Sequence, residues 1–142
     1  MASEVAVVKI LSNDAGTLNA LGSVAGVNAK IFMGRIPQGT QSPAIVIVRE
    51  ATVPSDTKTN VSRLDEETIK ISCYADDYAS ALAIAMAVRA AIDGIMNQTY
   101  IVGGITVNID HIWMQNEIYL AEENPDNILD VFEQTYSIRT KY

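Results

Sequence analysis

The sequence predicts an α+β fold: a mostly antiparallel sheet of about four to five strands, one main alanine-rich helix packed on it, a short N-terminal helix and a protruding hairpin arm. Three observations predict it. Apolar, β-branched runs alternate with turn residues along most of the chain, residues 78–92 combine helical periodicity with many alanines, and Gly103-Gly104 separates two apolar segments. At 142 residues we expect one domain, 1–142.

Two short helices and an edge strand are expected before residue 34. Ser3 is a suitable N-cap for the first helix, in which Val5, Val8 and Leu11 recur at a spacing that places them on one face. Gly22 would end the second helix, because glycine commonly follows a helix in the left-handed conformation. The three expected elements are 3–11, 17–21 and 27–33.

Two longer strands are expected at the centre of the sheet. Pro43 precedes a continuous apolar run, 44–48, which is typical of a strand buried on both faces. The partner strand, 64–75, alternates instead, which is typical of one buried face and one face open to water or to a partner. The expected buried residues are Ile69, Ile71 and Cys73, and the expected exposed residues are Thr68, Lys70 and Ser72.

The main helix and a long hairpin complete the expected fold. Asp76 is a suitable N-cap for a helix over 78–92. Gly103-Gly104 predicts a tight hairpin turn, because both glycines can adopt positive φ. The apolar parity changes near Asp110, which predicts a bulge or a change of buried face. The strands after the glycines are expected at 105–120 and 128–139, with Ile112, Met114, Ile118 and Leu120 on one face.

Composition restricts the function classes. The chain has 17 acidic and 10 basic residues and a net charge of −7, so it is a poor candidate for binding nucleic acid tightly. The acidic excess suits either simple solubility or a surface that nucleic acid passes without binding, and both interpretations stay open. The single cysteine excludes an intrachain disulfide and a cysteine-based zinc site. We expect no export signal and no membrane span. The single cysteine and the missing export signal fit a protein of the reducing cytoplasm.

No residues form an evident catalytic pattern. His111, the single histidine, is either a general base or, more simply, a half-buried strand residue. Cys73 lies on the apolar parity of its strand and is expected to be a buried, unreactive thiol. The acidic clusters 65–67, 76–77 and 122–123 match neither a paired acid/base site nor a calcium loop, and we expect them to cap a helix or to be solvated. The sequence therefore predicts no catalytic residue, no cofactor and no metal site.

The polar segment 52–63 is the strongest candidate for a functional feature. It is longer than a tight hairpin needs, and it is either a solvated loop or an arm that reaches a neighbouring subunit. The open side of the strand 64–75 and the edge of the last strand, 128–139, would belong to the contact surfaces of a ring. The residues expected at this interface with a subunit or a tube are Val53, Lys58, Val61, Arg63, Thr68, Lys70 and Ser72.

Several segments follow one another in an order that resembles a known family. They are Arg35-Ile36-Pro37-Gln38-Gly39-Thr40, then Ser42-Pro43 and Ile45-Val46-Ile47, then Ile69-Lys70-Ile71-Ser72-Cys73-Tyr74-Ala75, and then the helix from Tyr78 to Gly94. This order of a Pro-Gln-Gly turn, a strand, a second strand ending in Tyr-Ala and an alanine-rich helix resembles the tail-completion proteins of long-tailed bacteriophages. These are also called tail terminators or head-to-tail joining proteins. Ala44, where the family often has an aromatic residue, and the long last hairpin depart from the pattern.

The resemblance implies a structural protein and not an enzyme. It implies a ring, typically a hexamer, that ends the tail tube at full length and docks onto the head connector or neck proteins, while genomic DNA passes through the lumen without specific binding. It implies a place in the tail or neck of a virion assembled in the host cytoplasm, and a role for the arm in contacting the adjacent subunit or the tube. The alternatives are a small ligand-binding α+β module, with its ligand between the main helix and the long hairpin, and an enzyme that works through His111 and nearby acidic residues.

Overall fold

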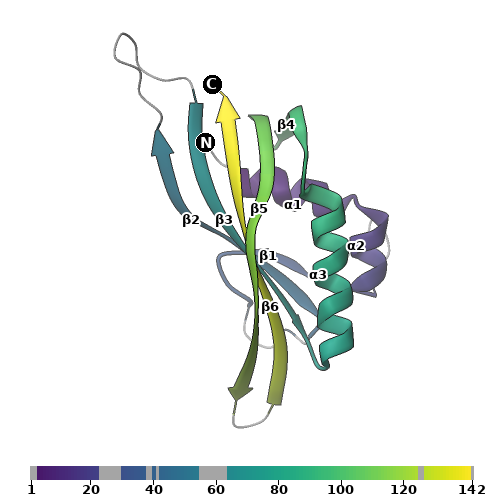
Figure 1. Cartoon of the computed structure of the whole chain (residues 1–142). Coiled ribbons are helices and arrows are strands. Elements are labelled where there is room, and N and C mark those ends of the chain that lie inside the picture. Colours follow the sequence, from purple (N-terminus) through teal and green to yellow (C-terminus); the bar gives the residue numbers. More distant parts are fainter. Residues whose placement is uncertain are drawn as a thin grey trace.

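A computed structural model describes residues 3–22, 30–37, 40, 42–54, 64–124 and 127–141. It shows a six-stranded sheet with helices packed on it, which confirms the expected α+β class and adds one strand to the predicted number (Figure 1). The elements in chain order are α1 (Ser3–Ser12), α2 (Ala15–Ala20), β1 (Ile31–Met33), β2 (Ala44–Pro54), β3 (Leu64–Ala75), α3 (Tyr78–Ile92), β4 (Met96–Val102), β5 (Ile105–Asn124) and β6 (Asn127–Lys141).

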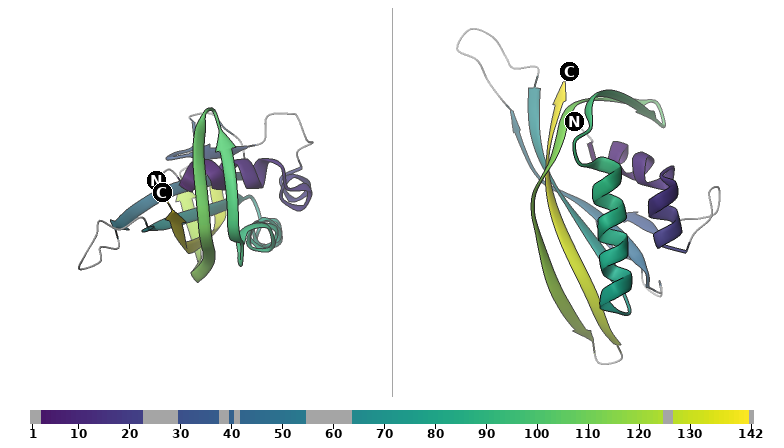
Figure 2. Two further views of the ribbon diagram at one scale, coloured as in Figure 1. Left: turned by 90° about the horizontal axis from the view of Figure 1, so that it is seen from above. Right: turned by 45° about the vertical axis from the view of Figure 1, so that its right-hand side comes forward.

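The sheet has the strand order β1-β2-β3-β6-β5-β4. Only β1 and β2 pair in parallel, and every other neighbouring pair of these strands is antiparallel. All three helices lie on the same side of the sheet (Figure 2). We call this side the helix face and the opposite side the open face.

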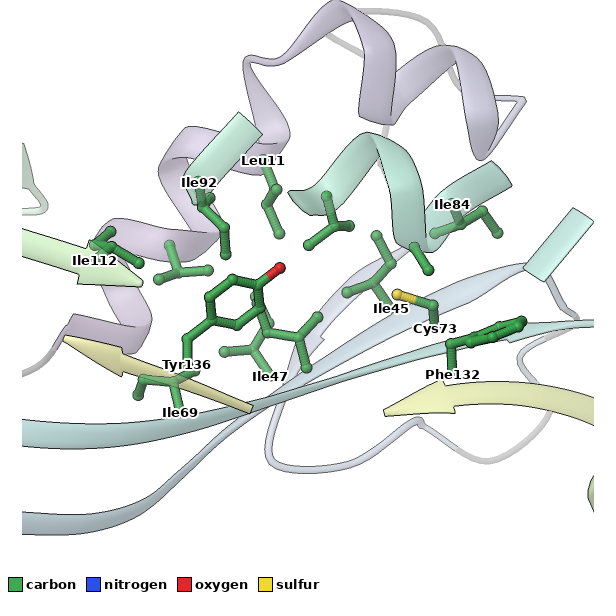
Figure 3. Packing of buried hydrophobic residues seen from close by; sticks show 14 of the residues in the cluster. Leu11, Ile45, Ile47, Ile69, Cys73, Ile84, Ile92, Ile112, Phe132 and Tyr136 are labelled. Atoms are coloured by element: carbon green, nitrogen blue, oxygen red, sulfur yellow. The ribbon is translucent and has the colours of Figure 1, made fainter. Parts of the chain in front are cut away.

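The core fills the space between α3 and the helix face. Ile45 and Ile47 of β2 and Ile71 of β3 are fully or almost fully buried there, together with Ile84 and Ile92 of α3. Tyr136 of β6 lies in the middle of this cluster (Figure 3). Burying one such aliphatic side chain contributes about 1.5–3 kcal/mol. The small alanines of α3 that face the sheet, Ala81 and Ala85, are also fully buried, so the helix packs closely as its composition predicts.

Helix α1 buries a different face from the one predicted. Ala6, Val7 and Leu11 are fully buried, whereas Val5 and Val8 are only partly buried. The backbone N–H of Ser3 donates a hydrogen bond to Glu67 Oε2 on β3 at 3.2 Å. This contact fixes the start of the helix against the sheet and so helps to determine which side of it faces the core.

Glu67 corrects the expectation that the acidic cluster 65–67 is solvated. Its side chain is fully buried. It lies on the helix face, because Glu67 is level with Thr52 of β2 and with the buried Ile138 of β6 in the register. Arg49 Nη1 donates to Glu67 Oε1 at 3.2 Å. A buried carboxylate is tolerated where hydrogen bonds and an opposite charge compensate for its lost hydration. Strand alternation alone could not predict this compensation, because the partners come from β2 and from the start of α1.

The N-cap of α3 is Asp77, one residue later than predicted. Asp77 Oδ1 accepts a hydrogen bond from the backbone N–H of Ser80 at 2.7 Å, and this bond lowers the pKa of Asp77. Asp76 instead accepts a hydrogen bond from the hydroxyl of Ser42. Both aspartates are therefore used, but only Asp77 satisfies a free N–H at the start of the helix.

Replacing Asp77 by alanine is expected to lower the melting temperature by a few degrees, because a free backbone N–H of α3 loses its acceptor. Thermal unfolding at pH 7 followed by circular dichroism measures the shift. Asp76→Ala is the matched control, since it removes the same charge from the neighbouring position without removing the cap. An equal or larger shift for Asp76→Ala would contradict the assignment.

Two bulges determine the faces of β5. The pairing with β6 shifts between Ile109 and His111, which confirms the bulge predicted near Asp110, and it shifts again between Met114 and Asn116. The first shift allows Ile109 and Ile112 to be buried on the helix face. The second, which the sequence pattern did not predict, returns the strand to its earlier parity. Ile118 and Leu120 therefore lie on the open face, and the prediction that they share a face with Ile112 and Met114 was wrong.

Candidate interaction surfaces

The residues considered for catalysis have structural roles. His111 is half-buried on the open face, and its ring packs against Trp113 with 4.7 Å between ring centres. The guanidinium carbon of Arg139 lies 6.0 Å from the centre of the Trp113 ring, within the range of a cation–π contact. Within the described ranges, no group of three or more His, Cys, Asp or Glu side chains is placed to hold a metal ion.

Cys73 is a buried thiol, as predicted. Its side chain is fully buried in the core, and this burial, with a smaller effect from the negative charge of Glu117, raises its pKa far above the ordinary value of 9.0. Burial likewise raises the pKa of Tyr136 far above 10.0. Neither group ionises easily in the folded protein, so Cys73 is unsuited to act as a thiolate nucleophile.

The free energy of unfolding should decrease as pH rises above about 9. Below that pH the Cys73 thiol is protonated in both states, and above it the thiol ionises in the unfolded chain but not in the folded one, at a cost of up to about 1.4 kcal/mol per pH unit. Tyr136 adds to the slope above about 10. Urea unfolding between pH 8 and 11 measures it. Cys73→Ala should flatten the slope from pH 9, and Tyr136→Phe only above pH 10; an unchanged slope in Cys73→Ala would contradict this assignment.

The space between α3 and the long β5–β6 hairpin is filled by hydrogen-bonded side chains of the described residues. Gln134, fully buried, donates from Nε2 to the carbonyl of Ala85 at 2.8 Å and to Glu117 Oε2 at 2.6 Å. Its Oε1 accepts a hydrogen bond from the hydroxyl of Tyr136 at 2.7 Å. These three bonds join β5, β6 and α3 across the core, so the site expected for a ligand-binding module is occupied by the protein's own packing.

The structure describes part of the predicted arm. The strands β2 and β3 extend beyond the helices, and Val53 near the end of β2 is 59% exposed (Figure 1). Lys58, Val61 and Arg63 lie outside the described residues. The arm therefore begins as a two-stranded ribbon that carries an exposed apolar side chain.

The three interface candidates on β3 differ in exposure. Thr68 and Lys70 are partly exposed on the open face, and Lys70 Nζ lies 3.5 Å from Glu50 Oε1. Ser72 is only 4% exposed, so its predicted exposure was wrong. It lies in the middle of the sheet between Val46 and Glu133, and a short side chain there is covered by its neighbours whereas a lysine reaches past them.

A second projection was not predicted as a candidate surface. The far end of the β5–β6 hairpin extends from the sheet opposite to the arm (Figure 1). Ile118 and Leu120 are 47% and 40% exposed on its open face. On its helix face, the rings of Tyr119, Tyr78 and Phe132 contact one another, with centres 5.1–5.4 Å apart. No sequence signal indicated this surface, because the apolar residues keep one parity from Ile112 to Leu120 and the shift after Met114 is visible only in the strand register.

The β4–β5 hairpin forms a third exposed apolar surface. Met96, Ile101 and Ile105 are 57%, 60% and 44% exposed. The two strands meet at Gly103 and Gly104, both with positive φ, as predicted. Lys9 Nζ donates to the carbonyl of Ile101 at 2.8 Å and ties this hairpin to α1.

No helix in the described part of the chain is long and apolar enough to span a membrane.

These features define a class of protein. Large apolar side chains are exposed at three projecting ends of the described sheet, while His111, Cys73 and Glu67 are held by neighbours within the fold. Exposed apolar side chains gathered at projecting ends are typical of surfaces that bind other proteins. The fold and its surfaces are therefore those of an assembly protein.

Comparison with known proteins gives the family. Residues 5–115 match the family described as Tail completion protein gp17, and the chain belongs to that family. It is a phage-like tail completion protein, a structural component of the virion and not an enzyme. The resemblance predicted from residues 35–94 is thus confirmed over a longer part of the chain.

A solved structure shows the same fold. A chain in the structure titled "Virion of native gene transfer agent (GTA) particle" is 17% identical to this chain, with a TM-score of 0.69, and the match covers 96% of this chain and 92% of that one. At this identity the likeness concerns the fold. No curated protein sequence matches the chain.

Proposed function

We propose that copies of this chain form a ring that ends the tail tube at its full length and joins it to the head connector or neck proteins. Membership of the tail completion family carries this proposal. Its exposed apolar side chains support it, because a structural protein acts through contacts and needs such surfaces. We propose that the ring is a hexamer and that it assembles in the host cytoplasm. DNA would pass through its lumen.

The β2–β3 arm and the open face are the surfaces that we propose for contacts with neighbours and with the tube. Val53 supplies an exposed apolar side chain, and Lys58, Val61 and Arg63 follow it in the sequence. Thr68 and Lys70 are the accessible candidates on the open face. Ser72 is less suited to a direct contact, because its side chain is already covered within the subunit.

We propose in addition that the acidic excess, a net charge of −7, keeps DNA from binding to the lumen. DNA phosphates are repelled by acidic side chains and bind where Lys and Arg displace counterions. Genomic DNA would then pass without specific contacts. This proposal concerns the whole ring and assigns no individual lumen residue.

The experiment that tests the ring is co-expression of the full chain with its cognate tail tube protein, followed by negative-stain microscopy and by measurement of tube lengths. We expect a ring at one end of each tube and a narrow distribution of lengths. Tubes of the same irregular lengths with and without this chain, and no density added at their ends, would contradict the proposed function. A ligand-binding module has no specific observation in its favour, since α3 and the long hairpin are joined by the contacts of Gln134.

A further inference from the structure

One edge of the sheet has a long free segment on β5. Strand β4 pairs with β5 only as far as His111. Beyond it, Ile112 bonds through its backbone to Gly94 and Ile95, and the N–H of Met114 donates to Asp93 Oδ1 at 3.0 Å. From Gln115 to Asn124, the described part of the chain offers β5 a strand partner on the β6 side only. The backbone groups on the other side are available to another chain.

The opposite edge has a free segment on β2. Strand β1 pairs with β2 only at Ile45–Ile47, and the N–H of Gly34 adds one bond to the carbonyl of Ile47. From Val48 to Pro54, the only strand next to β2 among the described residues is β3. These residues are mostly exposed. The free β2 segment lies at the arm end of the sheet and the free β5 segment at the other end (Figure 1).

The two free segments are complementary in direction. Strands β2, β3, β6 and β5 are antiparallel in succession, so β5 runs opposite to β2. If a second copy lies beside the first in the same orientation, with its β2 next to the β5 of the first, these two strands are antiparallel. Antiparallel pairing of two free edges satisfies the backbone groups of both. Each copy has one edge of each kind, so the contact can repeat around a ring.

The stagger between the two segments suits a closed ring. In the register, Ala51 of β2 is level with Thr68, Ser137 and Trp113. The middle of the free β5 segment, near Tyr119, lies about 17 Å further along the strand direction, at about 3.3 Å per residue and allowing for the bulge. Across the strands, the β2 edges of two neighbouring copies would be four strand spacings of about 4.8 Å apart, or about 19 Å. Copies kept at one height would thus have strands tilted by roughly 40°, within the range of closed β-barrels.

Side chains favour the pairing of unlike edges. Val53, Ile118 and Leu120 are all exposed and all lie on the open face, as their partners Glu66, Glu133 and Val131 in the register show. They would become neighbours across the new pair, which is favourable for apolar side chains on one face of a sheet. The free segment of β5, residues 115–124, has three acidic residues and no Lys or Arg in the sequence, so two such segments placed side by side would repel each other.

We propose that the free edge of β5, Gln115–Asn124, pairs in antiparallel fashion with the free edge of β2, Val48–Pro54, of a second copy of this chain, and that this pairing joins the sheets of neighbouring subunits into one closed sheet. The proposal rests on the proposed function, because it specifies how the ring is held together. It assigns the contact between subunits to the two strand edges and leaves the open face, with Thr68 and Lys70, turned to the lumen or the tube.

Cross-linking of two single-cysteine variants tests the pairing. Val53→Cys and Ile118→Cys are mixed in equal amounts, together with the cognate tail tube protein, and treated with a short bis-maleimide; the native Cys73 is fully buried. We expect dimers that contain one copy of each variant and few dimers from either variant alone, because equivalent residues of neighbours lie a whole subunit apart. Ile101→Cys, at an exposed position on another hairpin, is the control and should not cross-link with Ile118→Cys.

The outcomes separate this proposal from the proposed function. Rings at tube ends without the mixed cross-link would overturn the edge pairing and leave the ring intact, and cross-linking of Ile118→Cys with itself would show a two-fold contact and also overturn it. Absence of rings in the unmodified protein would instead contradict the proposed function.

As a second measurement, Ile118→Lys combined with Val53→Lys should preserve the melting temperature but reduce ring formation at least tenfold, since lysines on strand edges oppose pairing. Undiminished ring formation would count against the proposal.

Discussion

Replacing Gln134 by leucine is expected to lower the free energy of unfolding by about 2–4 kcal/mol, although leucine has a similar volume. The reason is the hydroxyl of Tyr136, which donates to Gln134 Oε1 and is fully buried. Without Gln134 this hydroxyl has lost its acceptor in the core, and the link from β6 to the Ala85 carbonyl of α3 is also lost. Urea unfolding at pH 7 measures the change.

A double variant distinguishes the hydrogen bond from packing. In Gln134→Leu combined with Tyr136→Phe both partners are replaced by apolar groups, so part of the loss, about 1–2 kcal/mol, should be recovered relative to Gln134→Leu alone. Glu117→Ala is the control, because Glu117 is exposed and Gln134 keeps its bond to Ala85 without it. If the free energies of unfolding lost in the two single variants simply add in the double variant, the two residues are not coupled.

Elements with strong local signals were predicted well. Strand β3 and helix α3 have the predicted bounds, because strict alternation and a long alanine-rich period leave little choice of register. The buried positions Ile69, Ile71 and Cys73 follow from the same alternation. The hairpin at Gly103-Gly104 was predictable from the need for positive φ at both residues.

Features that depend on contacts between distant segments were not predicted. Burial of Glu67 depends on Ser3 and Arg49, which are far from it in the sequence. The choice between Asp76 and Asp77 as N-cap depends on Ser42, which bonds to Asp76. A bulge moves every later residue to the other face, so missing the shift after Met114 placed Ile118 and Leu120 on the wrong side. The candidate surface at the far end of the β5–β6 hairpin was missed for this reason.

The free strand edges were not found from the sequence either: a contact edge was expected on the last strand, and this was wrong, because β6 pairs with β3 on one side and with β5 on the other. Whether a strand has a partner along its whole length depends on where its neighbours begin and end. β1 pairs with only Ile45–Ile47 of β2, and β4 begins opposite His111 of β5, so among the described residues the rest of both strands has no strand on that side. Natural proteins usually protect such edges with charge, proline or a covering segment. Here β5 continues past its last neighbour on that side with Ile118, Tyr119 and Leu120 exposed, which fits an edge that is covered only after assembly.

Deletion of Pro54–Ser62, with Asn-Gly in their place, is expected to leave the fold intact and to abolish assembly on the tube. The strands on either side remain paired through Thr52 and Glu67, and the core residues of β2 lie at the other end of the strand, so the melting temperature should change by only a few degrees. The arm would no longer reach the adjacent subunit or the tube. Negative-stain microscopy with the cognate tube protein counts the capped tubes.

The control for this deletion is a variant of equal length in which residues 55–62 are replaced by glycine and serine. If reach alone matters, this variant should assemble; if the arm's own side chains make the contact, it should fail as the deletion does. Retained assembly after the deletion itself would contradict a role for the arm. In that case the cross-link between Val53→Cys and Ile118→Cys becomes the decisive measurement, because the free edge of β2 up to Val53 survives the deletion and can still pair with β5 of a neighbour.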